Sequence, residues 1–82
     1  MKYTVVWLPG AQSALANLWM HASDPQEVAD ASNRLDTDLI KDPEKKGSPF
    51  GNFLVREDAP LSIMYHVDPA DRMVRVIAVK GI

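Results

Sequence analysis

The 82-residue sequence contains no cysteine, which excludes a disulfide framework, a thiolate zinc site and a cysteine nucleophile. It also lacks long apolar runs, since none exceeds the four residues of Val5 to Leu8. A membrane-spanning helix needs about 20 apolar residues, and a secretory signal needs a basic start followed by a long apolar segment. We therefore expect a cytoplasmic protein with no membrane partner.

An excess of positive charge is missing as well. Nine Lys and Arg residues stand against eleven Asp and Glu residues, giving a formal net charge of −2, which argues against a globally basic nucleic-acid binder. The balance is uneven, because residues 1–42 carry three basic and six acidic side chains whereas residues 43–82 carry six and five. The second half is therefore locally positive.

The composition that is present suits one small globular domain, residues 1–82, with 46% hydrophobic and 24% charged residues. A chain of this size buries only about 60% of its unfolded surface, so its stability margin is thin. We expect support from a partner chain or from a homodimer, because the sequence offers no disulfide and no evident metal site.

The first half of the chain reads as one strand and two helices. Residues 2–7 are β-branched and aromatic and predict a strand, which Pro9-Gly10 interrupts. From Ala11 to about His21 the apolar residues recur at helical spacing. Asp24-Pro25-Gln26-Glu27 has the pattern of a helix N-terminus with a capping box, and Pro43 stops the second helix after about Lys41.

The second half reads as a polar connector, residues 43–51, followed by three strands. These are predicted at residues 52–56, 61–67 and 73–79, and the last two are joined by a turn at residues 68–71. The order β-α-α-β-β-β predicts an α+β fold, with a helical hairpin packed on one face of a mostly antiparallel four-stranded sheet.

Strand alternation predicts which side chains face away from the helices. Leu61, Ile63, Tyr65 and Val67 make the better core face, so Ser62, Met64 and His66 are expected to face outward. In the last strand Arg75 marks the outward set, which alternation extends to Met73, Ile77 and Val79. With Arg56 and Lys80 nearby, this predicts an open sheet face that is partly apolar and partly basic, a candidate surface for a partner or ligand.

No motif in the sequence assembles a metal site or a catalytic centre. His21 and His66 are far apart, and no serine lies in a Gly-x-Ser-x-Gly elbow, so we expect no metal and no cofactor. His66 is either an inert surface residue or an acid–base group, and Arg56 either pairs with Glu57 and Asp58 or binds a ligand. Trp7 and Trp19 each fall on an apolar periodicity and are expected to pack in the core or between helices.

The ordered set of elements resembles the RelE/ParE superfamily of type II toxin–antitoxin toxins over nearly the whole chain. The resemblance is carried by the strand at residues 3–7, by the helix through Ala14-Leu15-Ala16-Asn17-Leu18-Trp19, by the helix exit at residues 33–43, and by the terminal strands at residues 60–67 and 72–79. It implies a toxin neutralised by a small antitoxin protein, acting either on mRNA at the ribosome or on DNA gyrase.

The predicted open sheet face supplies the candidate site residues. Arg56, His66 and Arg75 are the candidates for catalysis, with Arg56 the nearest match to the family's basic residues, and Ser62, Met64, Met73 and Lys80 are the candidates for binding the antitoxin or the target. The sequence departs from the RNA-cutting members, because Ser62 stands where their arginine opens the strand, and Phe53 and Val55 stand where basic residues are expected.

Three functions follow as hypotheses. The first is the toxin of a type II toxin–antitoxin module, with its cellular target open between mRNA and gyrase. The second is a non-toxic protein-interaction module of the same fold, and the third is a ribosome-dependent mRNA endonuclease. The acidic net charge counts against the third, because a ribosome-directed nuclease approaches a strongly anionic surface.

Overall fold

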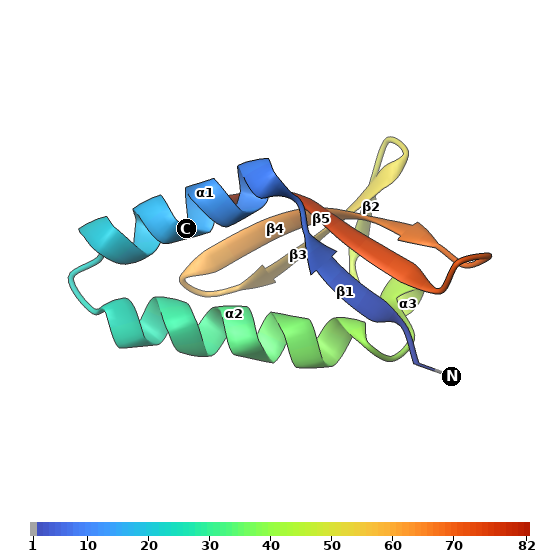
Figure 1. The fold of residues 1–82 in the computed structure, drawn as a ribbon, viewed down its shortest axis with the longest axis horizontal. Helices are drawn as coiled ribbons and strands as arrows, with labels where there is room; N and C mark the ends of the chain where they lie inside the picture. The colour runs from blue at the N-terminus through green and yellow to red at the C-terminus, as the bar shows by residue number, and fades with distance from the viewer. Residues whose placement is uncertain (1) are drawn as a thin grey trace.

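The computed structural model describes residues 2–82 and shows two long helices beside one sheet (Figure 1). Along the chain the elements are β1 (Thr4–Trp7), α1 (Pro9–His21), α2 (Pro25–Leu39), α3 (Pro43–Lys46), β2 (Ser48–Phe50), β3 (Phe53–Asp58), β4 (Leu61–Asp68) and β5 (Met73–Gly81). The predicted α+β fold, with a helical hairpin on a mostly antiparallel sheet, is confirmed.

The sheet has five strands in the order β1-β5-β4-β3-β2. The three neighbouring pairs from β5 to β2 are antiparallel, whereas β1 joins the edge of β5 in parallel, with Thr4 opposite Met73 and Trp7 opposite Val76. The two helices that connect β1 to the rest of the chain supply the crossover that a parallel pairing requires.

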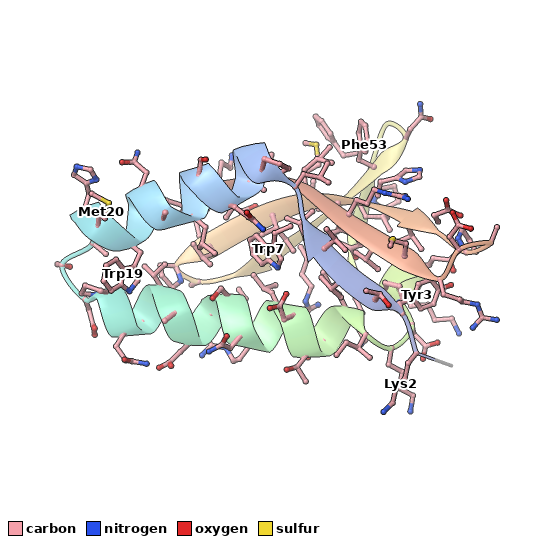
Figure 2. All side chains as sticks on the ribbon, in the orientation of Figure 1. Lys2, Tyr3, Trp7, Trp19, Met20 and Phe53 are labelled. Carbon is pink, nitrogen blue, oxygen red and sulfur yellow. The ribbon has the colours of Figure 1, made fainter. Side chains whose placement is uncertain are left out.

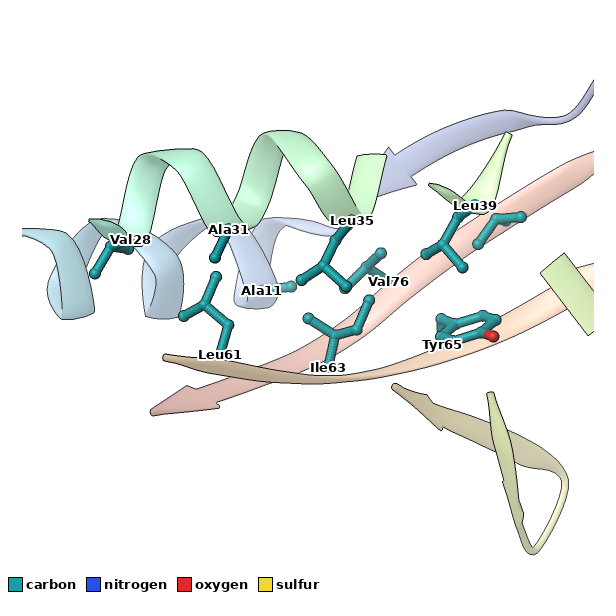
Figure 3. Packing of buried hydrophobic residues seen from close by; sticks show 10 residues of the cluster. Ala11, Val28, Ala31, Leu35, Leu39, Leu61, Ile63, Tyr65 and Val76 are labelled. Carbon is teal, nitrogen blue, oxygen red and sulfur yellow. The ribbon is translucent and has the colours of Figure 1, made fainter. Parts of the chain in front are cut away.

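The core lies between the helices and β4 and β5 (Figure 3). Val28, Ala31, Leu35 and Leu39 form the buried stripe of α2, at the spacing of one helix face. Against this stripe pack the alternate residues of the two strands, Leu61, Ile63, Tyr65, Val74 and Val76. The predicted core face of β4 is therefore confirmed: its first three members are fully buried, and Val67 packs against the core while partly buried.

The predicted number of four strands is wrong, because an additional strand, β2, forms inside the segment that the sequence predicts as a connector. Pro43–Lys46 forms one helical turn, and Ser48–Phe50 pairs with β3 as a hairpin whose two-residue turn is Gly51-Asn52. Gly51 has φ +62°, a conformation that glycine adopts without steric cost. The hairpin adds β2 to one edge of the sheet.

A β-bulge in β5 changes which side chains face outward. Met64 lies opposite Ala78 and Tyr65 lies opposite Val76, so Ile77 is an extra residue between the two pairs. The extra residue shifts the alternation by one position. Val79 consequently lies opposite Ile63 and packs against the core, and the prediction that places it on the outward face with Arg75 is wrong.

The predicted capping box of α2 is corrected. Asp24 occupies the N-cap of α2, but its side chain makes no capping hydrogen bond, and the Glu27 N–H instead donates to the Asp24 carbonyl at 3.1 Å.

The two tryptophans take the two predicted placements. Trp7 packs against the core, and its Nε1 donates to Asp36 on α2. Trp19 is 49% exposed and lies outside the core, beside Val28 and Ala29 of α2.

Between residues 2 and 82, none of the helices has the length and apolar character needed to cross a membrane.

Candidate functional site on the open face of the sheet

The sheet face turned away from α1 and α2, the open face, is formed by the residues that alternate with the core residues. Its cross-strand neighbours follow from the register: Val55 lies opposite Met64, Ser62 opposite Lys80, and His66 opposite Arg75. Figure 2 shows Phe53 projecting from the sheet, well away from α2. The residues of the open face are Phe53, Val55, Glu57, Ser62, Met64, His66, Met73, Arg75, Ala78 and Lys80.

One half of the open face is hollowed into a groove of about 420 Å³, the open-face groove. Phe50 forms part of its wall and is 61% exposed. Its lining residues are Ser48, Pro49, Phe50, Val55, Glu57, Ser62, Ile63, Met64, Ala78, Val79 and Lys80. Three of the predicted binding residues, Ser62, Met64 and Lys80, therefore meet in one groove.

Opposite charges flank this groove at one end. Glu57 and Lys80 lie on the two strands beside Ser62, because both are register partners of that serine. Ser62 itself is only 4% exposed, so it contributes to the floor. The groove thus combines an apolar wall with one anionic and one cationic side chain, an arrangement suited to a protein segment rather than to a polyanion.

The other half of the open face carries His66, Arg75 and Met73. The exposed His66 ring meets the edge of Phe53, with the ring centroids 6.3 Å apart and the planes at 74°. Arg75 Nη1 lies 3.7 Å from Asp68 Oδ2, and Met73 lies opposite the same aspartate. His66 and Arg75 are therefore neighbours, as predicted, but the carboxylate of Asp68 offsets part of the arginine charge.

Arg56 is on the other side of the sheet, so its predicted place on the open face is wrong. It lies opposite the buried Ile63, and its guanidinium turns toward α2. Arg56 Nη2 donates to Asp38 Oδ2 at 2.8 Å and Nη1 donates to the Lys46 carbonyl at 2.9 Å. The guanidinium can lie on the helix side of the sheet because these two acceptors satisfy its hydrogen-bonding groups there.

Tyr65 lies beside this half-buried arginine and serves the fold. Its hydroxyl donates to the Pro43 carbonyl at 2.7 Å. Burial raises the pKa of Tyr65 to about 12, with the positive charge of Arg56 acting in the opposite direction. The hydroxyl therefore stays protonated at neutral pH and anchors α3 beneath the sheet.

An ion pair joins α2 to the end of β3. Arg34 Nη2 lies 2.9 Å from Asp58 Oδ1, and Arg34 Nε also donates to that carboxylate. The hydrogen bond from Arg34, together with its charge, lowers the pKa of the Asp58 carboxyl. Asp58 is thus held by α2, and the two arginines of this side, Arg34 and Arg56, are both engaged in the fold.

The open face is better equipped for binding than for acid–base chemistry. In the described part of the chain, no three His, Cys, Asp or Glu side chains come together as a metal site. His66 has an aromatic and a cationic neighbour but no carboxylate bonded to its ring in residues 2–82. The apolar groove is the feature with the most defined shape.

Sequence reasoning missed part of this groove. The sequence places Phe50 in a connector, and it does not predict that Val55 lies opposite Met64 or that Glu57 lies opposite Ser62. The signal was present in Phe50-Gly51-Asn52-Phe53, because glycine in a two-residue turn between apolar residues is typical of a hairpin. That hairpin brings the aromatic and apolar side chains to the edge of the open face.

Comparison with solved structures defines the class of fold. Over all or nearly all of its length, the chain superposes on structures of RelE and ParE toxin–antitoxin systems, with TM-scores of 0.63 to 0.84. The chain therefore has the RelE/ParE toxin fold. Compared by sequence alone, it matches no family model and no curated relative.

Three of these structures are informative. A chain of the toxin–antitoxin complex RelBE2 from Mycobacterium tuberculosis is 20% identical, with a TM-score of 0.84, and the match covers all of this chain and 93% of that one. The chromosomal ParDE toxin–antitoxin system from P. aeruginosa is 12% identical with a TM-score of 0.73, covering 99% and 97% of the two chains. A mutant of the E. coli toxin RelE in its free state is 16% identical with a TM-score of 0.63, covering 99% and 84%.

Proposed function

We propose that this protein is the toxin component of a type II toxin–antitoxin module, acts in the cytoplasm and is neutralised by a small antitoxin protein. The observation that carries the proposal is an open, partly apolar and partly basic sheet face on the RelE/ParE fold. Two of the matched structures, RelBE2 and ParDE, come from toxin–antitoxin systems, which supports a protein antitoxin as the partner.

The antitoxin is proposed to cover the open face. The open-face groove presents Phe50, Val55 and Met64 to a partner, and apolar side chains that stay uncovered on a small protein favour association. Lys80 and Glu57 at its flank orient a segment that carries the opposite charges. Met73 lies outside this groove and belongs to the adjoining cationic half.

Inducible expression in bacteria with and without a candidate antitoxin tests the proposal. Expression of the protein alone arrests growth, and co-expression of the small protein encoded next to it restores growth. Normal growth at a high level of soluble protein would exclude a toxin function for this protein.

A non-toxic interaction module of the same fold is the second candidate. It is favoured by the apolar groove and by the engagement of Arg56 with Asp38, which removes one predicted cation from the open face. For this candidate, affinity purification yields a tightly bound small partner while expression of the protein alone leaves growth unchanged.

The cellular target distinguishes two possible toxin activities, a ribosome-dependent mRNA endonuclease and a gyrase inhibitor. His66 and Arg75 lie opposite each other and are the residues proposed for cleavage, whereas a role for Arg56 requires its guanidinium to leave Asp38. A nuclease leaves mapped cuts in translated mRNA that His66→Ala and Arg75→Ala each reduce strongly. A gyrase inhibitor leaves mRNA intact and blocks supercoiling of plasmid DNA by purified gyrase.

A further inference from the structure

Three polar side chains form a row across one end of the open-face groove. Glu57 on β3 and Lys80 on β5 are both register partners of Ser62, which lies on β4 between them. All three residues line the groove, so their side chains lie on the side of the sheet that faces away from the helices. Glu57, Ser62 and Lys80 are called the polar row below.

The two charges of the polar row are free to meet a partner. Glu57 and Lys80 are exposed, whereas Ser62 is only 4% exposed and lies at the floor. Within residues 2–82, neither Glu57 nor Lys80 belongs to an ion pair. The two residues are two strand spacings apart, which separates their Cα atoms by about 10 Å. The row therefore presents one anion and one cation at a separation that the sheet fixes.

The groove runs across the strands, because its lining residues come from β2, β3, β4 and β5. The strands β3, β4 and β5 each have a neighbour on both sides, so their backbone groups are bonded within the sheet. A partner on this face therefore contacts side chains. An extended strand would leave its own backbone groups unpaired there, whereas a helix satisfies its own.

Helix geometry matches the separation of the two charges. Residues seven apart in a helix lie on the same side and are about 10.5 Å apart along the axis, at a rise of about 1.5 Å per residue. A helix that crosses the strands over the polar row can therefore place one such residue over Glu57 and the other over Lys80.

We propose that the polar row selects the antitoxin by charge, through a helix that carries Lys or Arg over Glu57 and Asp or Glu seven residues away over Lys80. The apolar residues of this helix pack on Val55 and Met64, beside the exposed Phe50. A helix with two like charges at these positions meets a like charge at one end of the row and is disfavoured. Glu57 and Lys80 thus determine which helix the groove accepts.

This inference rests on the proposed function, since it concerns the surface that is proposed to bind the antitoxin. The two fail in different experiments. Growth of cells that express the protein alone tests toxicity, whereas charge selection is measured by binding to the purified protein. A protein that shows the charge selection without arresting growth refutes the toxin function alone, and one that arrests growth without the selection refutes this inference alone.

Three synthetic peptides of about 18 residues, long enough to form a helix, serve as probes. All carry the same leucine stripe and differ only at two positions seven residues apart, which hold Lys and Glu, Lys and Lys, or Glu and Glu. We expect calorimetry with the full chain to show that the Lys/Glu peptide binds at least about fivefold more tightly than either of the others. Equal binding of the three peptides, or no binding of the Lys/Glu peptide, overturns the proposal.

Charge reversals in the polar row are expected to change which peptide binds best. Lys80→Glu leaves two anions in the row and is expected to favour the Lys/Lys peptide, and Glu57→Lys leaves two cations and is expected to favour the Glu/Glu peptide, each by about fivefold. Both residues are exposed, and circular dichroism confirms that the variants are folded. An order of affinities that stays the same in the wild type and both variants overturns the proposal.

Lys45→Glu is the matched control, because it changes the net charge as Lys80→Glu does at an exposed position of α3 outside the groove. We expect it to keep the wild-type preference within about twofold. A shift as large as that of Lys80→Glu would assign the selection to net charge and overturn the proposal. Sedimentation of the protein alone should give a monomer, and a dimer that Lys80→Glu dissociates would identify a second copy as the occupant and also overturn it.

Discussion

At the scale of single residues, the fold depends on a close contact between a glycine and a buried tyrosine. A Cβ atom added at Gly47 would lie 2.5 Å from the Tyr65 hydroxyl oxygen and 3.1 Å from the Leu54 Cβ. Tyr65 is fully buried and holds α3 through Pro43, so it has no room to move aside. Glycine at position 47 therefore lets the connector pass close to Tyr65 without displacing it.

Gly47→Ala is expected to lower the free energy of unfolding by about 1–3 kcal/mol, because the added methyl group displaces the Tyr65 hydroxyl. Urea denaturation measures the change. Gly10→Ala is the matched control, since beyond its own helix turn and chain neighbours nothing lies within 4 Å of a Cβ at that position, and it is expected to be neutral or slightly stabilising in the helix. Equal losses in the two variants would contradict the packing described for Gly47.

Tyr65→Phe removes the hydrogen bond to the Pro43 carbonyl and is expected to cost about 1–2 kcal/mol at neutral pH. The folded-state pKa of Tyr65, about 12, lies above the ordinary value of 10.0. The stabilisation from this residue is therefore complete below pH 10 and lost as the pH rises toward 12. Urea denaturation at a series of pH values should show that the difference in free energy of unfolding between wild type and Tyr65→Phe narrows between pH 10 and 12. A difference that stays constant would contradict the role assigned to the Tyr65 hydroxyl.

At the scale of elements, local sequence patterns predicted the helices and the alternation of β4. They did not predict the β-bulge in β5 or the position of Arg56. Leu61, Ile63 and Tyr65 could be placed because every second residue is large and apolar. The bulge at Ile77 could not be predicted, because both residue sets of β5 are apolar and either phase satisfies the pattern. Arg56 was misplaced for a related reason: its acceptors, Asp38 and the Lys46 carbonyl, come from segments distant in sequence.

The bulge predicts different losses of stability for two single-residue deletions in β5. Removing Ile77 leaves Val79 facing the core and Lys80 facing outward, because only the extra residue is lost. Removing Val79 moves Lys80 to the position opposite Ile63, where its charge meets the core. We expect the protein without Val79 to unfold at a clearly lower urea concentration than the protein without Ile77; the reverse order would contradict the assigned register.

The β2–β3 hairpin gives a second prediction at this scale. Gly51→Ala forces an L-residue to adopt φ near +62°, which is expected to cost about 1–2 kcal/mol, while Asn52→Ala in the same turn costs less. Because Phe50 forms part of the open-face groove, we also expect Gly51→Ala to weaken any partner that binds there. Thermal unfolding measures the first effect, and similar losses in both variants would contradict the turn geometry.

At the scale of the whole molecule, the RelE/ParE toxin fold leaves one face of its sheet uncovered by α1 and α2. This open face is partly apolar, with Arg75 and Lys80 as its cations. The sequence indicated this surface through Arg75 and Met64.

Growth of bacteria that express the protein alone tests the central claim most directly, namely that the open face carries the toxic function. Wild type and Ser13→Arg, whose change lies on α1, are expected to arrest growth. Met64→Arg, which places a charged side chain in the open-face groove, is expected to permit growth at the same level of folded protein. Growth with the wild type, or arrest by Met64→Arg equal to that of the wild type, would contradict the claim.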